Sequence, residues 1–108
     1  MLRLKSDTDN LVDFTVDADI SAVSDIEFLL MSHRAQSGVL VTKRLSLGGD
    51  GLVRVDANNF TVRLGRNDLA DLSGLYYLQA HAVDGYGDHV DLEITPNTAY
   101  VKRKVNPS

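Results

Sequence analysis

Apolar and polar residues alternate along most of the chain with a period of two, the pattern of strands that bury one face. Residues 13–20 show it clearly, with Phe14, Val16, Ala18 and Ile20 separated by polar residues. Turn-forming residues separate the alternating segments, so the pattern predicts seven or eight short strands and an all-β sandwich or barrel. The expected strand segments are 13–20, 25–33, 38–47, 52–56, 59–64, 75–83, 88–94 and 98–105.

The segment 66–74 (RNDLADLSG) is the best candidate for helix, as a single turn in a crossover between strands. Asn67 or Asp68 could cap this turn, and Gly74 could end it. Glycines mark two other turns. LGGDGLV follows the third expected strand, and Asp84-Gly85-Tyr86-Gly87-Asp88 supplies hairpin chemistry, with both glycines available for a positive φ.

The pattern of segment 75–83 predicts a central strand, because one of its faces is uniformly apolar and the other is mixed. Adjacent residues of a strand point to opposite faces, so Tyr76 and Tyr77 cannot share one platform. Tyr76 is expected in the core with its hydroxyl bonded to the backbone, and Tyr77 on the outer face. In segment 25–33, the same alternation places Leu29 and Met31 on the face opposite Ile26, Phe28 and Leu30.

Composition bounds the class of protein. The 108 residues are 44% hydrophobic and 24% charged, which predicts one soluble domain over 1–108, with an N-terminal arm at 1–10 and a tail at 106–108. No apolar run is long enough for a membrane helix, and no secretory signal is expected. The net charge of −4 disfavours nucleic-acid binding. The absence of cysteine excludes disulfides and thiolate chemistry.

Candidate chemistry is sparse. Asp7, Asp9, Asn10 and Asp13 begin like a calcium loop, but the glycine and the final Glu of that motif are missing. Asp84 and Asp88 could also hold a hard cation, although turn chemistry explains isolated aspartates equally well. His81 and His89 could face each other across the hairpin as a zinc pair or a pH switch, but no third ligand accompanies them. The simpler interpretation is that both, like His33, are ordinary strand histidines. Ser73 has no nucleophile elbow around it. We therefore expect no catalytic residue, no metal, no cofactor and no enzyme activity.

Four segments in order carry a resemblance to a known family: VTKRLSLGGDGL, NFTVRLGRNDLADLSGLYY, HAVDGYGDHVDL and TAYVKRKVNP. Together they resemble the small immunoglobulin-like β-sandwich proteins of phage and prophage virions, over roughly residues 10 to 106. The resemblance implies a single immunoglobulin-like antiparallel β-sandwich with one short helical crossover. It also implies a virion component, made in the host cytoplasm, and it carries over no catalytic residue.

The expected function is structural, most simply as a capsid decoration or cement protein that docks on a larger assembly. Expected partners are other virion proteins, either the major capsid protein or tail and neck proteins, and the chain could also self-associate; no nucleic acid and no membrane are expected. A neck, tail or baseplate accessory protein and a carbohydrate-binding module, with Tyr77 or Tyr86 in a shallow groove, remain alternatives. Two interpretations explain VKRKV. Its lysines could keep an edge strand from pairing with other chains, or they could dock on an acidic capsid or tail surface. The candidate interaction surface is Leu29, Met31, Leu75, Tyr77, Tyr86, Lys102 and Lys104.

Overall fold

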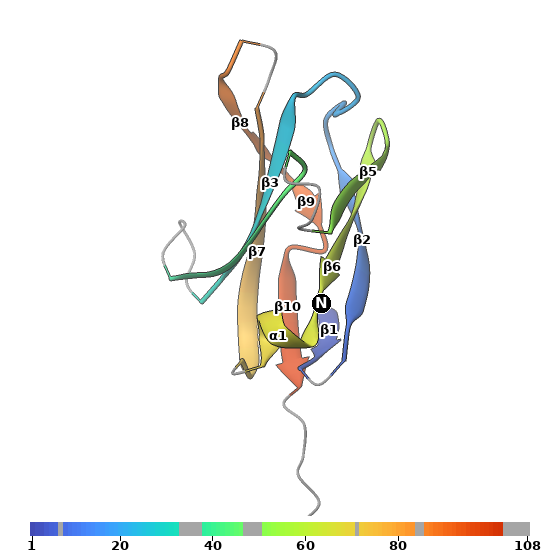
Figure 1. Ribbon diagram of the computed structural model, residues 1–108. Helices are drawn as coiled ribbons and strands as arrows, with labels where there is room; N and C mark the ends of the chain where they lie inside the picture. Colours follow the sequence, from blue (N-terminus) through green and yellow to red (C-terminus); the bar gives the residue numbers. More distant parts are fainter. Residues whose placement is uncertain (7, 33–37, 47–50, 71, 84–85, 103–108) are drawn as a thin grey trace, which may run out of the picture.

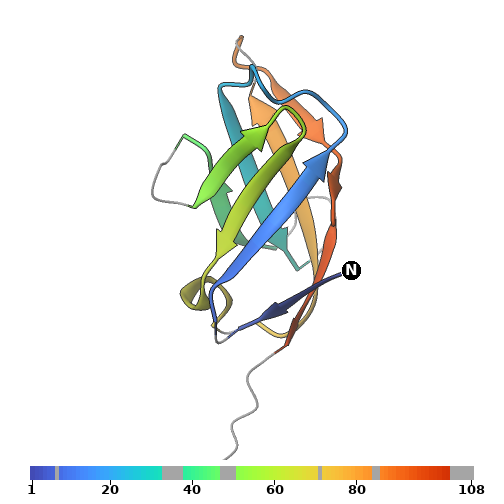
Figure 2. The same cartoon turned by 90° about the vertical axis from the view of Figure 1, so that its right-hand side faces the viewer.

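The computed structural model describes residues 1–6, 8–32, 38–46, 51–70, 72–83 and 86–102. In this part of the chain, strands form two sheets that pack face to face as a β-sandwich (Figures 1 and 2). The expected all-β sandwich with one short helix is therefore confirmed.

The larger sheet has six strands in the order β1-β10-β7-β3-β4, with β8 paired to the C-terminal half of β7. Its neighbouring strands are antiparallel, except that β1 runs parallel to β10. The strands are β1 (Leu2–Lys5), β10 (Thr98–Lys102), β7 (Gly74–Val83), β3 (Asp25–Met31), β4 (Val39–Arg44) and β8 (His89–Leu92).

The smaller sheet has four strands in the order β5-β6-β2-β9, all antiparallel. They are β5 (Leu52–Asp56), β6 (Asn59–Leu64), β2 (Asn10–Val16) and β9 (Ile94–Thr95). The described residues thus hold ten strands, more than the seven or eight expected. The difference arises because the expected N-terminal arm contributes β1, and because the chain after β8 makes a short strand in the smaller sheet before it enters β10 in the larger one.

The core lies between the sheets, where Phe14, Phe28 and Phe60 are completely buried. The ring of Phe14 lies 5.1 Å from that of Phe28 and 5.3 Å from that of Phe60, measured between centroids. Phe28 belongs to the larger sheet and the other two to the smaller one. The aromatic cluster therefore joins the two layers.

The short helix α1 (Arg66–Leu69) connects β6 to β7 at one end of the sandwich (Figure 1). Its Leu69 is buried. Its first turn closes at Gly65, whose amide donates to the Asp68 carboxylate at 2.8 Å. The N-cap position is thus Gly65, and not Asn67 or Asp68 as expected. Asp68 instead reaches back from inside the turn.

Tyr76 confirms its expected role at the start of β7. The side chain is buried, and its hydroxyl bonds both the amide and the carbonyl of Ser73 at 3.0 Å. The polar tip of this core aromatic is therefore satisfied by the backbone of the preceding turn.

Candidate docking surface

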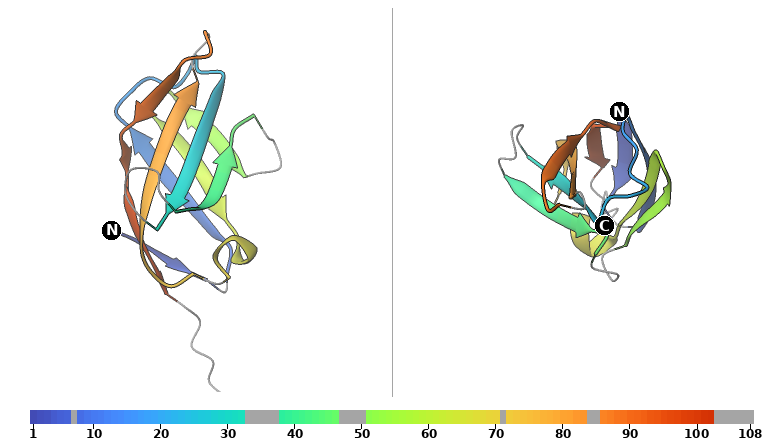
Figure 3. Two further views of the ribbon diagram at one scale, coloured as in Figure 1. Left: turned by 90° about the vertical axis from the view of Figure 1, so that its left-hand side faces the viewer. Right: turned by 90° about the horizontal axis from the view of Figure 1, so that it is seen from above.

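The outer face of the larger sheet carries a continuous apolar surface across four strands. Cross-strand partners share a face, and the register places Tyr100 opposite Leu75, Tyr77 opposite Met31, and Met31 opposite Val39. This face is turned toward the viewer in the left part of Figure 3. We call the following group the outer patch: Val39, Leu40, Leu75, Tyr77 and Tyr100.

The outer patch is open to solvent. Val39 is 43% exposed, Leu40 48%, Leu75 46% and Tyr100 47%, while Tyr77 is half-buried among them. Contiguous exposed apolar surface is a candidate interaction site. The patch is therefore a candidate docking surface.

The opposite face of the sandwich lacks this continuity. Leu11 and Val53 are 74% and 58% exposed on the smaller sheet. Their cross-strand partners on the intervening strand β6 are Arg63 and Thr61. Polar side chains thus separate Leu11 from Val53, and the apolar surface on β5 is limited to Val53 and Val55. Small groups of exposed apolar residues are ordinary.

Leu29 and Met31 were expected to be exposed, and this is wrong, since they are only 6% and 2% accessible. Both lie on the outer face as the alternation predicted, but β3 has neighbours on both sides. Leu29 lies between Thr42 and Gln79, and Met31 between Val39 and Tyr77. The two residues form the floor of the outer patch and support its exposed members.

Tyr86 is 94% exposed but lies beyond the far end of β7. At about 3.3 Å per residue, the eight steps from Leu75 to Val83 already span about 26 Å. A small ligand could not contact both Leu75 and Tyr86. Lys102 is exposed at the end of β10, and Lys104 lies outside the described residues, as does His33.

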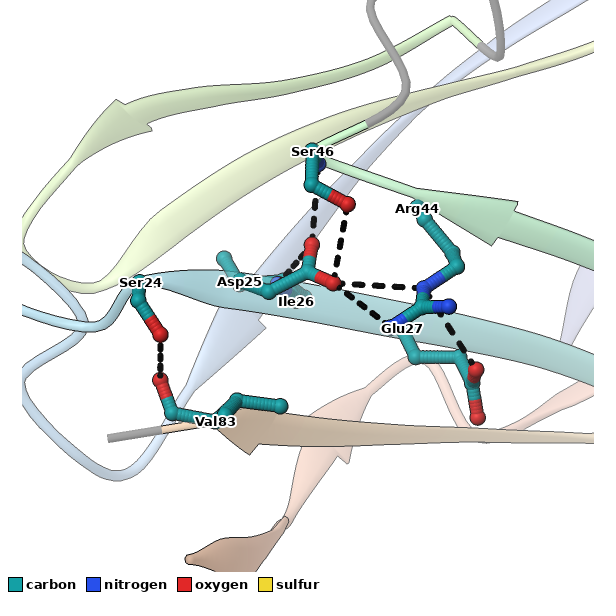
Figure 4. A network of polar contacts seen from close by, with 7 residues as sticks. All are labelled: Ser24, Asp25, Ile26, Glu27, Arg44, Ser46 and Val83. Carbon is teal, nitrogen blue, oxygen red and sulfur yellow. Dashed lines mark hydrogen bonds and ion pairs between the residues drawn. The ribbon is translucent and has the colours of Figure 1, made fainter. Parts of the chain in front are cut away.

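A buried carboxylate lies at the other end of β3 (Figure 4). Asp25 is 6% exposed and accepts hydrogen bonds from the amide and hydroxyl of Ser46 at 2.9 and 3.0 Å, and from Arg44 at 2.9 Å. Arg44 also lies 3.7 Å from Glu27. Nearby, the hydroxyl of Ser24 donates to the carbonyl of Val83 at 3.0 Å. The bonds from Arg44 and Ser46 tie the start of β3 to the end of β4.

His81 and His89 are not cross-strand partners, so the structure contradicts the facing pair that the sequence left open as an alternative to ordinary strand histidines. The register of the β7–β8 hairpin places His81 opposite Asp91 and His89 opposite Val83. Nδ1 of the buried His81 lies 2.7 Å from an Asp91 oxygen. A carboxylate on the strand opposite therefore positions this imidazole.

The N-terminal acids do not converge either. Asp9 pairs with Arg63 at 2.8 Å, the Asn10 amide donates to the carbonyl of Lys5 at 3.0 Å, and Asp13 accepts from Thr61 at 2.9 Å. The hydrogen bond from Arg63 is the main cause that holds the pKa of Asp9 below its usual value. Asp7 and Asp84 lie outside the described residues, and the described ones contain no cluster of three or more His, Asp or Glu that could hold a metal.

A shallow groove of about 440 Å³ opens where β7 has passed β10 and not yet reached β8. Its polar lining includes Gln79, Glu93 and Asn97. Gln79 follows Tyr77 on the same face of β7, so the groove adjoins the outer patch. The sequence pattern did not predict this groove, because the groove depends on where the chain crosses from β8 in the larger sheet to β9 in the smaller one and back to β10.

No helix among the described residues has the length and apolar character needed to cross a membrane.

No family model and no curated protein sequence matches the chain. Among solved structures, the crystal structure of CopC from Methylosinus trichosporium OB3b is similar to it. The TM-score is 0.52 and the sequence identity 10%, over 100% of this chain and 91% of that chain. At this identity the likeness shows the fold alone, a β-sandwich, and says nothing about what this chain binds.

Proposed function

We propose that this chain is a non-enzymatic structural protein of a phage particle, a decoration protein that docks on the capsid through the outer patch. The observation that carries the docking role is the exposed apolar surface on β10, β7 and β4, which lies around the buried outer face of β3. The assignment to a phage particle is supported by the resemblance of four sequence segments to virion β-sandwich proteins. A neck, tail or baseplate position uses the same surface with fewer copies.

The outer patch has the composition of an interface centre. Tyrosine and large aliphatic side chains lie over a rigid floor of Leu29 and Met31, and polar residues such as Thr42 and Gln79 border them. Apolar and aromatic groups inside a polar rim are typical of protein–protein interfaces. A preformed sheet face also loses little conformational entropy on binding.

Quantitative mass spectrometry of purified virions from the source phage tests the proposal. Copies comparable to those of the major capsid protein would support decoration, whereas copies far below it would assign the chain to the neck, tail or baseplate. Complete absence from the particles would overturn the virion role.

A matched pair of variants tests the surface itself. Particles that lack the chain are incubated with purified wild type, Leu75→Ser or Leu11→Ser, and bound copies are counted. We expect Leu75→Ser to weaken binding by about tenfold or more, which corresponds to 1.4 kcal/mol. Leu11→Ser removes an equally large exposed residue from the opposite face and should bind as the wild type does; equal loss in both variants would contradict docking through the outer patch.

The groove beside Gln79 favours a carbohydrate-binding module as the second candidate. Gln79, Glu93 and Asn97 supply hydrogen-bonding groups in the groove, and the half-buried Tyr77, two residues before Gln79 on the same face of β7, would supply a stacking surface at its edge. Binding on a glycan array that is abolished by Tyr77→Ala would support this function. Absence of glycan binding would remove it.

A further inference from the structure

Three basic side chains at one corner of the larger sheet stand apart from the other cations of the described chain. Most of the others are engaged within the molecule: Lys43 with Asp68 at 2.9 Å, Arg44 with Asp25 at 2.9 Å, Arg63 with Asp9 at 2.8 Å, and Arg54 with the carbonyls of Ile20 and Val23 at 2.9 and 3.0 Å. By contrast, no carboxylate of the described residues lies within ion-pair distance of Arg3, Lys5 or Lys102. We call these three residues the basic rim.

The basic rim lies on the outer face of the sheet. Leu4 and Val101 point into the core, so the alternation turns Arg3, Lys5 and Lys102 to solvent, where all three are exposed. Lys5 and Lys102 are direct partners in the parallel β1–β10 ladder. Neighbouring strands lie about 4.8 Å apart, so the side chains of Lys5 and Lys102 leave the backbone at adjacent positions on the same face.

This arrangement is unfavourable in the isolated chain, because like charges at partner positions repel. It is also unusual in a protein whose net charge is −4. An anionic group placed between the two lysines would relieve the repulsion. The corner therefore has a stronger affinity for negative charge than the whole molecule does.

The basic rim is continuous with the outer patch. Arg3 is the partner of Tyr100 in the β1–β10 ladder, and Tyr100 is the partner of Leu75 in the β10–β7 ladder. Across three adjacent strands, the surface thus changes from cationic to aromatic to aliphatic. A ligand that covers Tyr100 and Leu75 would necessarily approach Arg3.

We propose that the partner docked on the outer patch is an acidic protein segment, whose carboxylates contact the basic rim while an apolar residue covers Tyr100 and Leu75. This inference rests on the proposed docking function and adds the chemistry of the partner. Three cations offer too few phosphate contacts for strong nucleic-acid binding. The apolar half of the surface fits a protein better than a uniformly charged polymer.

Binding of synthetic probes tests the chemistry without the particle. The probes are a short peptide of alternating glutamate and leucine, the same peptide with serine for leucine, and a short DNA duplex of equal charge, each followed by fluorescence anisotropy and by amide shifts in NMR spectra of the labelled chain. We expect the leucine peptide to bind at least about threefold more tightly than the serine peptide, and to weaken between about 50 and 300 mM salt. The shifted amides should cluster on β1, β10 and the start of β7.

Charge reversal provides the matched control. Lys5→Glu/Lys102→Glu should lose peptide binding by about tenfold or more, whereas Arg63→Glu/Arg66→Glu makes the same change in net charge on other elements and should retain it. Tighter binding of DNA than of peptide, shifts outside the corner, or equal binding by both double variants would overturn the acidic partner. A concentration-dependent dimer in sedimentation that the lysine double variant abolishes would assign the corner to a second copy of this chain and also overturn it.

The two proposals fail in different ways. Particle binding that Leu75→Ser weakens, but that neither salt nor Lys5→Glu/Lys102→Glu affects, keeps the docking function and overturns the acidic partner. Peptide binding at the corner without any association with particles keeps the acidic partner chemistry and overturns the virion role.

Discussion

The carboxylate of Asp25 shows how one residue can hold two strands together. It accepts hydrogen bonds from Ser46, beyond the end of β4, and from Arg44 within β4, and it also accepts from the amide of Ile26 at 2.9 Å (Figure 4). A buried carboxylate is stable only when it is paired and hydrogen-bonded, and these donors satisfy it. The sequence shows an aspartate at the start of an expected strand, but the donors from residues 44 and 46 become its neighbours only through the β3–β4 register.

We predict that Asp25→Asn destabilises the fold by about 2–3 kcal/mol at neutral pH. The amide keeps the shape of the carboxylate but offers a donor group to the donors of Arg44 and Ser46, and it removes the charge that Arg44 pairs with. Urea denaturation at pH 7 measures the loss. Asp13→Asn, whose exposed carboxylate accepts one bond from Thr61, is the control and should change stability by less than about 0.5 kcal/mol.

The difference between wild type and Asp25→Asn should also depend on pH. Burial raises the pKa of Asp25, but the hydrogen bonds from Ser46 and Arg44 outweigh it and hold the pKa below its ordinary value of 3.8. A carboxyl whose folded pKa is lowered stabilises the fold above the unfolded value and loses that contribution as the pH falls through the folded value. The stability gap should therefore be constant above about pH 5 and shrink in more acidic solution. A gap that widens on acidification would contradict this origin.

At the scale of elements, the alternation of apolar and polar residues predicted the positions of most strands, but not which strands lie side by side in a sheet. The strands of Phe28 and Phe60 begin where a period of two placed them, because a buried face is a local property of the sequence. The strand of Phe14 is Asn10–Val16 and not 13–20 as expected. The burial of Leu29 and Met31 depends on β3 being flanked by β4 and β7, which local pattern does not reveal. The same holds for Arg3 and Lys5, whose place in the candidate surface depends on a parallel pairing with residues nearly a hundred positions away.

Two glycines allow a test of what limits a turn. Gly51 and Gly87 both have a φ of +84°, but a Cβ at Gly51 would lie 2.9 Å from the Cβ of Arg63, whereas a Cβ at Gly87 would meet nothing within 4 Å. Both alanine variants bear the cost of a positive φ, about 1 kcal/mol. We predict that Gly51→Ala loses at least about 1 kcal/mol more than Gly87→Ala, because the backbone of β5 must also move away from β6. Thermal and urea unfolding of the two variants measure the difference, and equal losses would mean that the close approach at Gly51 relaxes without cost.

At the scale of the whole molecule, stability and docking depend on different faces of the same strands. β7 and β3 bury Leu78 and Phe28 in the core on one side, while Leu75 and Met31 form part of the outer patch and its floor on the other. The floor of the patch is therefore held by the same strands that carry the core. A variant that weakens the core without altering the outer face should then separate the two properties.

Phe14→Leu is that variant. The ring of Phe14 contacts Phe28 across the layers and stacks on Phe60 within the smaller sheet, so a smaller side chain at this position leaves a gap where the two sheets meet. We predict a loss of about 1–2 kcal/mol for Phe14→Leu and about 3–5 kcal/mol for Phe14→Ala, out of the roughly 5–15 kcal/mol that stabilises a domain of this size. The urea midpoint should fall while the slope of the transition is unchanged, because the same surface is exposed on unfolding. Below its unfolding temperature, Phe14→Leu should still bind particles and acidic peptide as the wild type does, whereas Leu75→Ser should lose binding with little loss of stability. If Phe14→Leu instead weakened binding as strongly as Leu75→Ser, the outer patch would not be the contact surface, and binding would depend on the spacing of the two sheets.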